Sequence, residues 1–155
     1  LNSFITLNDL DASLTYVGDG PLRSDLESAI SDLGLTSVTV LGNVDSIDAI
    51  YQQADCLVMA SHWEGLPMVI LEAGSYGVGV ISSPVGAIPD LLKSGRGFLV
   101  EPLDLSNAMK KVVKNPHLCR DAGLKLQSYV IDQFSLESSV ESHLKFYKEV
   151  LDLQV

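Results

Sequence analysis

The sequence is short of cysteine, of long apolar runs and of positive charge, and each shortage excludes a class of protein. Two cysteines among 155 residues, Cys56 and Cys119, are too few for a disulfide framework or a metal cluster. No apolar run approaches the roughly 18 to 20 residues of a membrane-spanning helix, and the first residues do not resemble a signal peptide. We therefore expect a cytoplasmic protein, whose full-length form contacts a membrane peripherally if at all.

Positive charge is scarce and unevenly placed. Ten basic against twenty acidic residues give a net charge of −10, which argues against a nucleic-acid partner. No Lys or Arg lies between Arg23 and Lys93. An anion bound by the middle of the chain would therefore depend on backbone N–H groups, or on cations from elsewhere.

What the sequence does contain is a regular alternation of short β-branched runs and helical patterns. A length of 155 residues and a hydrophobic content of 46% suit one domain with its own core. We expect strands at residues 14–17, 38–41, 56–60, 78–82 and 98–100, and helices at residues 1–10, 21–33, 45–53, 66–77, 88–93, 105–114, 117–132 and 136–153. This order predicts an α/β, Rossmann-like fold with one parallel sheet and helices on both faces.

The stretch at residues 57–90 is the most informative. Its apolar run breaks at residues 61–65 and resumes with one helical face, made of Leu66, Val69, Ile70, Ala73, Gly74 and Gly77. Pro67 suits the first turn of that helix, because its fixed φ is already helical. Glu64 then lies in the loop and Glu72 in the helix.

The spacing of these two acids limits their chemistry. Eight residues of helix rise about 12 Å, whereas the two carboxylates of a glycoside hydrolase lie roughly 5 to 9.5 Å apart. Glu64 and Glu72 better suit two ends of one elongated ligand, whose middle lies over the helix N-terminus at residues 65–69. Free N–H groups and the helix dipole favour a phosphate there.

The same residues resemble a known family. The segments EGLPMVILE, EAGSYG and VGAIPDLL are similar to the E-x7-E region of retaining glycosyltransferases of the GT-B class, in the family-four (group 1) type, and the similarity runs from TYVGDGPL at Thr15 to FYKEVL at Phe146. The resemblance implies half of a GT-B fold: a single donor-binding domain over residues 1–155, cut at its N-terminal edge. In the family, the first Glu lies near the donor sugar hydroxyls and the second binds the nucleotide ribose, roles that fall on Glu64 and Glu72.

The resemblance also implies a substrate and partners. The ligand is a nucleotide diphosphate sugar, with no cofactor and no bound metal ion, and a hexosyl group passes with retention to a glycan or lipid-linked acceptor. An acceptor-binding domain and a basic pair are expected before Leu1, and the last helix is expected to return to that partner domain, leaving part of its apolar stripe exposed here.

Further candidate residues surround the two acids. Ser61 is a candidate to bind a phosphate or to cap the helix, and the backbone of Gly65, Leu66, Pro67 and Met68 is expected to face the diphosphate. Gly18 follows the first strand, at the carboxyl edge where such sheets bind ligands. The backbone at Gly86 is expected to approach the donor.

Three other functions fit parts of the sequence. Residues 73–77, AGSYG, are a near miss to the G-x-S-x-G nucleophile elbow of serine esterases, with Ser75 as the nucleophile, but an elbow must precede a helix and residues 78–82 read as a strand. A nucleotide-sugar epimerase shares the architecture with different acids. A non-catalytic nucleotide-sugar-binding or interaction module would keep the fold without the activity.

Overall fold

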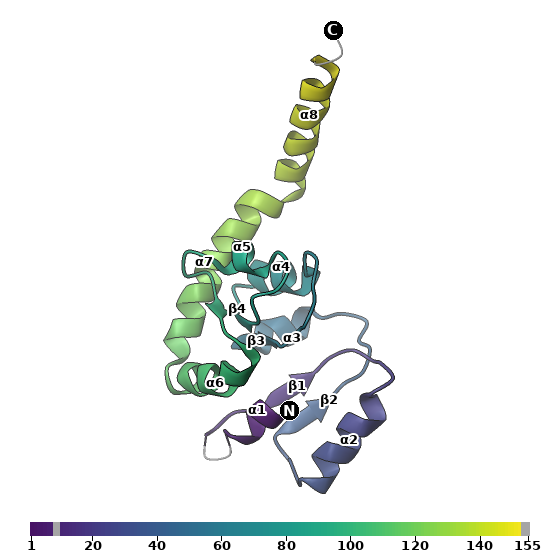
Figure 1. Cartoon of the computed structure of the whole chain (residues 1–155), viewed down its shortest axis with the longest axis vertical. Helices are drawn as coiled ribbons and strands as arrows, with labels where there is room; N and C mark the ends of the chain where they lie inside the picture. The colour runs from purple at the N-terminus through teal and green to yellow at the C-terminus, as the bar shows by residue number, and fades with distance from the viewer. Residues whose placement is uncertain (8–9, 153–155) are drawn as a thin grey trace.

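The computed structural model describes residues 1–7 and 10–152, and it confirms the alternation of strands and helices (Figure 1). Parallel strands are covered by helices on both faces, as the sequence predicts. The elements are α1 (Asn2–Ile5), β1 (Leu14–Tyr16), α2 (Arg23–Asp32), β2 (Val38–Val40), α3 (Asp48–Gln53), β3 (Cys56–Met59), α4 (Met68–Ser75), β4 (Gly79–Ser82), α5 (Ile88–Leu92), β5 (Phe98–Leu99), a 3₁₀ turn at Pro102–Asp104, α6 (Leu105–Lys114), α7 (Pro116–Phe134) and α8 (Leu136–Asp152).

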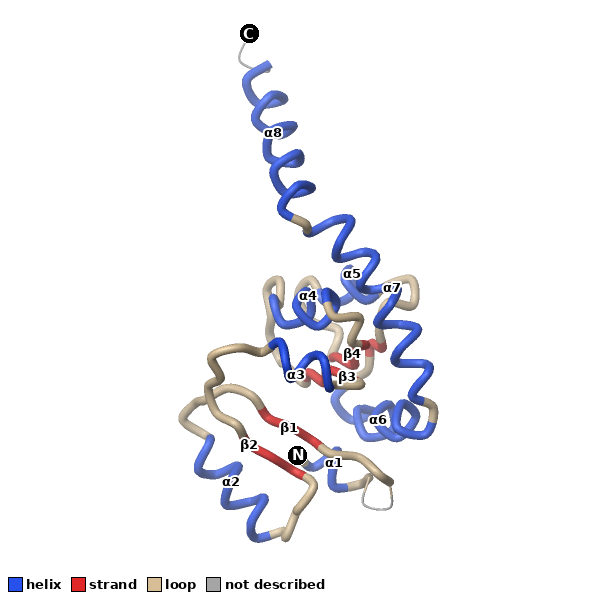
Figure 2. Tube along the Cα trace, turned by 180° about the vertical axis from the view of Figure 1, so that it is seen from behind, coloured by secondary structure: helices blue, strands red, loops and turns tan. Residues whose placement is uncertain are grey.

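The strands pair differently from the single sheet expected. Among the described residues, β1 and β2 form a two-stranded parallel sheet that lies apart from β3 and β4 (Figure 2). Strands β3, β4 and β5 form the other sheet, with β4 in the centre. Strands β1 and β2 are three residues long, which leaves few backbone groups to extend the ladder. Side chains connect the two sheets instead, because Leu14 and Val38 share a core cluster with Ile81.

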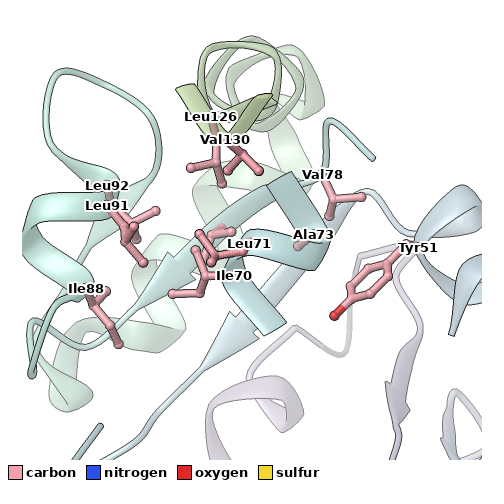
Figure 3. Close-up of a cluster of buried hydrophobic side chains, with 11 residues drawn as sticks. Tyr51, Ile70, Leu71, Ala73, Val78, Ile88, Leu91, Leu92, Leu126 and Val130 are labelled. Atoms are coloured by element: carbon pink, nitrogen blue, oxygen red, sulfur yellow. The ribbon is translucent and has the colours of Figure 1, made fainter. Parts of the chain in front are cut away.

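The core lies on both faces of the three-stranded sheet, because successive side chains of a strand point to opposite sides. Val80 lies in a cluster with α3, α4, α5 and the C-terminal half of α7, shown in Figure 3. Its neighbour Ile81 lies in the second cluster, with α1, α6 and Cys119 at the start of α7. All four residues of β4 are buried, so this strand is the centre of the molecule.

Helix α7 crosses the amino end of β4 through contacts between glycines. A Cβ at Gly123 would occupy the place of the Gly77 carbonyl oxygen and would lie 2.7 Å from the Gly79 nitrogen. On α4, a Cβ at Gly74 would lie 2.8 Å from Val130 Cγ2. Small residues at both crossings let α7 hold α4 and β4 together, which leaves the opposite, carboxyl edge of the sheet open for a site.

The last helix, α8, extends away from the rest of the molecule (Figures 1 and 2). None of its described residues is buried, and Leu136 at its start is 75% exposed. The apolar stripe that the sequence predicts on this helix is therefore exposed, as expected: Leu136, Val140, Leu144, Tyr147 and Leu151.

Some element boundaries differ from the prediction. The first helix ends at Ile5 rather than at residue 10. At its end the Thr6 hydroxyl donates a hydrogen bond to the Ser3 carbonyl at 2.9 Å. Residues 8–9 and 153 of the predicted helices lie outside the described residues. Helix α3 begins at Asp48 rather than residue 45. Across the described part of the chain, no helix is both long and apolar enough to cross a membrane.

Candidate functional site

The candidate site lies where the strands end, in the loops that follow them. The β3–α4 loop contains Ser61, Glu64 and Gly65, and the β4–α5 loop contains Ser83 and Gly86. These two loops are fastened to each other by hydrogen bonds. The Ser83 amide donates to the Met59 carbonyl at 3.3 Å, and the Ala87 amide donates to the Gly65 carbonyl at 3.0 Å.

Glu64 lies in the loop, as predicted, and is held by Ser61, which is held in turn by Ser83. The Ser61 hydroxyl donates to Glu64 Oε1 at 2.7 Å, and Glu64 is half-buried. The Ser83 hydroxyl donates in turn to the Ser61 carbonyl at 2.6 Å. Because Ser83 is only 3% exposed, this bond is shielded from water and fixes the loop that carries Glu64.

Gly86 has a structural reason to be a glycine. Its φ is +56°, in the left-handed region that favours Gly, and a Cβ would occupy the place of the Glu64 carbonyl oxygen. Gly86 therefore packs directly against the backbone of the loop that carries Glu64. Its predicted approach to a donor molecule stays a prediction.

Glu72 lies on α4 and is held by a tyrosine from α3. The Tyr51 hydroxyl lies 3.2 Å from Glu72 Oε2 and 3.2 Å from the Val69 carbonyl oxygen. Burial, and then the charge of Glu72, raise the pKa of Tyr51 to about 12. The hydroxyl therefore remains protonated near neutral pH and acts as a donor, while Glu72 is half-buried at the surface of α4.

The N-terminus of α4 faces solvent between the two acids. Met68 is its first residue, and no side chain of the described residues caps it. The first N–H groups of a helix have no partner within it, so they are available to an anion. Gly65, Leu66 and Met68 are exposed around this end, whereas Pro67 is buried.

Two predictions about α4 are corrected. Pro67 is the N-cap rather than a first-turn residue, because its ψ of 111° is extended and its carbonyl accepts from Ile70. Leu66, predicted on the apolar face of this helix, lies in the loop before it, and Leu66 and Val69 are both exposed. The buried residues are Ile70, Leu71, Ala73 and Gly74, since α4 turns that face toward α7 and β4.

Gly18 lies at the same end of the first sheet. Its φ is +116°, and its amide donates to the Gly42 carbonyl at 2.7 Å, which joins the β1–α2 and β2–α3 loops. Arg23 lies over Gly42, and its charge is already matched by Asp19 at 3.3 Å and Glu27 at 2.8 Å. The Gly18 amide and the Arg23 guanidinium at this edge therefore already have partners within the protein.

The nucleophile elbow is ruled out by the order of elements. Ser75 is the last residue of helix α4 and is followed by strand β4, whereas an elbow needs a strand before the serine and a helix after it. The Ser75 hydroxyl donates to the Glu72 carbonyl at 2.7 Å. The serine esterase hypothesis is therefore wrong.

Two polar residues of the site were missed from the sequence, Tyr51 and Ser83. Ser83 follows β4 just as Ser61 follows β3, so the rule that sites form at strand ends could have found it. In the sequence, Tyr51 is not distinguished from the other apolar residues of its short helix. Its contact with Glu72 could not be predicted, because it depends on how α3 packs against α4. Trp63, beside Glu64, is 84% exposed.

The site contains no recognisable metal-binding cluster. Among the residues described by the structure, no group of three or more His, Cys, Asp or Glu side chains is placed to hold a metal ion. The groups that the described residues place at this edge are the carboxylates of Glu64 and Glu72, the hydroxyls of Tyr51, Ser61 and Ser83, and the backbone N–H groups of α4.

Known proteins share this sequence pattern. The family model described as "Glycosyl transferases group 1" matches residues 2–115. The N-acetyl-alpha-D-glucosaminyl L-malate synthase of Bacillus anthracis is 29% identical over 94% of the chain, which covers 39% of that protein. An alpha-1,4-N-acetyl-D-galactosaminyltransferase of Campylobacter jejuni, whose full name includes an undecaprenol-linked glycan, is 32% identical over 86% of the chain, which covers 38% of it.

Solved structures share the fold. The HepE protein of Anabaena, solved in complex with UDP-glucose, aligns with a TM-score of 0.81 at 22% identity. The alignment covers 94% of this chain and 43% of that one. The chain thus spans about two fifths of the length of each of these three proteins.

Proposed function

Since the chain belongs to the glycosyl transferases group 1 family, we propose that it is the donor-binding part of a retaining hexosyltransferase. The observation that carries this proposal is the arrangement around α4. Two carboxylates, each oriented by a hydroxyl, lie before and after the exposed N-terminus of one helix. Such an arrangement suits a ligand with hydroxyls at both ends and an anion between them, which describes a nucleotide diphosphate sugar.

Each part of the site has a role in this proposal. Glu72 accepts hydrogen bonds from the ribose hydroxyls, and Glu64 orients the sugar that is transferred. The diphosphate lies between them, over the backbone N–H groups of residues 65–68 and with Ser61 nearby. Gly18 and Gly86 bring the backbone of the neighbouring loops close to the same ligand.

Transfer breaks the bond between the anomeric carbon and the diphosphate oxygen, and the bonding electron pair leaves with the diphosphate. The acceptor hydroxyl oxygen forms the new bond on the same face of the sugar, and its proton is released with the nucleoside diphosphate. Backbone N–H groups already aimed at the departing oxygens stabilise the charge that develops there. Glu64 contributes by holding the sugar in position for this step.

The names of the similar proteins support the choice of ligands. HepE was solved with UDP-glucose, and the name of the Campylobacter protein includes an undecaprenol-linked glycan. We propose a glycan or lipid-linked acceptor, bound mainly by a domain beyond this chain, since relatives are more than twice as long. A cytoplasmic protein that reaches a membrane peripherally would suit such an acceptor.

Calorimetric titration tests the binding roles. The chain is titrated at low salt with UDP, GDP and ADP and with their sugar conjugates, beside the variants Glu72→Ala and Glu64→Ala. Glu101→Ala, which removes an exposed acid in the loop after β5, is the matched control. We expect Glu72→Ala to lose affinity for nucleotide and conjugate alike, and Glu64→Ala to lose it mainly for the conjugate. Equal losses for both ligands in Glu64→Ala would contradict the division of roles.

A non-catalytic nucleotide-sugar-binding module is the alternative. It is favoured by the state of Arg23 beside the Gly42 loop, because this cation is already paired with Asp19 and Glu27 rather than free to stabilise a departing diphosphate. Both functions predict the same nucleotide binding, so turnover must separate them. A longer protein that includes the acceptor domain should release nucleoside diphosphate in proportion to glycosylated product, and Glu64→Ala should reduce both. Binding without product would favour the module.

A further inference from the structure

We propose that Tyr51 is a positioning residue, which holds the Glu72 carboxylate in the orientation that recognises the ribose hydroxyls. This inference rests on the proposed function, because it assigns the ribose to Glu72. It adds a residue that lies outside the β3–α4 region, on the short helix α3. Tyr51 acts through Glu72 and need not touch the nucleotide itself.

The contact is between a buried donor and a partly exposed acceptor. Tyr51 is 6% exposed, and its hydroxyl lies 3.2 Å from Glu72 Oε2. Figure 3 shows its ring reaching from α3 toward α4, at the margin of the buried cluster. A carboxylate has two oxygens, so Oε1 and the free lone pair of Oε2 remain for the two ribose hydroxyls.

The tyrosine is itself held firmly. Its ring stacks on that of Tyr76, with ring centroids 5.6 Å apart and an angle of 20° between the planes. The Tyr76 hydroxyl in turn binds Asp48 Oδ1 at 2.5 Å. Asp48 and Tyr51 are neighbours on one face of α3, and Glu72 and Tyr76 lie one turn apart at the end of α4. The stack on Tyr76, the bond from Tyr76 to Asp48 and the contact of the Tyr51 hydroxyl with the Val69 carbonyl oxygen therefore fix the position of this hydroxyl.

The direction of the hydrogen bond follows from the protonation of the phenol. Burial and the charge of Glu72 keep the Tyr51 pKa at about 12, so the hydroxyl carries its proton near pH 7. Both nearby atoms, Glu72 Oε2 and the Val69 carbonyl oxygen, can only accept. The one hydroxyl proton faces two acceptors at 3.2 Å, and the charged carboxylate is the stronger of them. We therefore take Glu72 as the acceptor, and the carboxylate loses rotational freedom before the nucleotide arrives. Immobilising one such side chain in advance is worth about 3- to 10-fold in affinity.

The experiment compares UDP with 2′,3′-dideoxy-UDP, which lacks the ribose hydroxyls that Glu72 would bind. Both are titrated into the wild-type chain, Tyr51→Phe, Glu72→Gln and the double variant. Tyr129→Phe is the control, because Tyr129 packs against the same cluster. We expect Tyr51→Phe to weaken UDP binding about 3- to 10-fold and to leave dideoxy-UDP unchanged. The double variant should bind UDP as Glu72→Gln does, since Tyr51 acts only through Glu72.

Failure of the inference and failure of the proposed function look different. A wild-type chain without any preference for UDP over dideoxy-UDP would overturn the ribose role of Glu72. A preference that Glu72→Gln abolishes but Tyr51→Phe retains in full would overturn the role of Tyr51 alone. Equal weakening of both ligands by Tyr51→Phe would also overturn it, because that result indicates a merely structural role.

A second variant covers the case in which Tyr51→Phe does not fold. A fluorinated tyrosine at position 51 keeps the ring and the hydroxyl but lowers the phenol pKa. Once ionised, this phenol cannot donate to Glu72 and repels its charge. We expect the preference for UDP over dideoxy-UDP to fall as the pH rises through that ionisation, and a preference independent of pH would overturn the proposal.

Discussion

The two halves of the molecule, β1, α2 and β2 in the first and the elements from α3 to α7 in the second, are built in different ways. In the first half, β1 and β2 pair through three residues each, and none of the described residues of α2 is buried. In the second half, every residue of β4 is buried and α4 buries four residues against α7 and β4. The first half is thus loosely packed and joins the rest through the cluster that Leu14 and Val38 share with Ile81. The second half is a packed core that carries both Glu64 and Glu72.

The contacts near the site differ in the same way. Arg23 in the first half is held by two ion pairs whose side chains are more than one third exposed, and exposed pairs of this kind contribute little to stability. The loops of the second half meet through backbone atoms, at Gly86 against Glu64 and at Ala87 against Gly65. Precise orientation of the two acids therefore depends on the second half.

The largest expected effect comes from the crossing of α7 and β4. Gly123→Ala places a Cβ on the Gly77 carbonyl oxygen, and backbone on both sides cannot move apart cheaply. We expect a loss of about 3 kcal/mol in the free energy of unfolding, despite the better helix propensity of Ala. Chemical denaturation measures it.

The control for this variant lies in the first half. A Cβ at Gly20 meets no atom of the described chain within 4 Å, so Gly20→Ala should change stability by less than about 0.5 kcal/mol. Similar losses in the two variants would show that the two halves are equally packed.

The next effect concerns the contact between the two loops of the site. Gly86→Ala meets both a strained φ of +56° and the Glu64 carbonyl, whereas Gly34→Ala has a φ of +61° and no described atom within 4 Å. Gly34→Ala should therefore lose about 1 kcal/mol, and Gly86→Ala about 2 to 3 kcal/mol. The difference measures the loop contact alone, and equal losses would mean that the loops are not fastened there.

A smaller effect is expected for the serine that holds this loop. Ser83→Ala removes the donor to the Ser61 carbonyl, which should lower the free energy of unfolding by about 1 kcal/mol. Ser128→Ala, which removes an exposed hydroxyl bonded to the Leu124 carbonyl, should be nearly neutral. A loss in Ser128→Ala as large as that in Ser83→Ala would show that burial does not decide the effect.

The sequence predicted local structure better than the contacts between elements. The positions of Glu64 in a loop and Glu72 in a helix followed from apolar spacing, which depends on a few neighbouring residues. The apolar face predicted for this helix included Leu66 and Val69, which are exposed, because the face that α4 turns inward is set by α7, more than 40 residues later. The division into two sheets and the bond between Tyr51 and Glu72 are likewise products of packing between distant segments, which no local pattern encodes.

The smallest expected effect tests the contact between α3 and α4, which pack in the same buried cluster around Val80. Helix α3 follows β2, and its Asp48 accepts a hydrogen bond from Tyr76, at the end of α4. This bond, and then the one from Ser46, lower the pKa of Asp48 below its ordinary value of 3.8, and the same bond raises the pKa of Tyr76 above 10.0. The lowered pKa of Asp48 stabilises the fold at any pH above the pKa of this carboxyl in the unfolded chain, and the gain is lost as the pH falls through its pKa in the folded protein. The raised pKa of Tyr76 stabilises the fold at any pH below the pKa of this phenol in the unfolded chain, and that gain is lost as the pH rises through its pKa in the folded protein. The stability difference between the wild type and Tyr76→Phe should therefore be greatest between about pH 4 and 10 and shrink on both sides, as denaturation across this range would measure. A difference independent of pH would mean that the bond to Asp48 does not stabilise the contact between α3 and α4, because Phe keeps the ring stack on Tyr51.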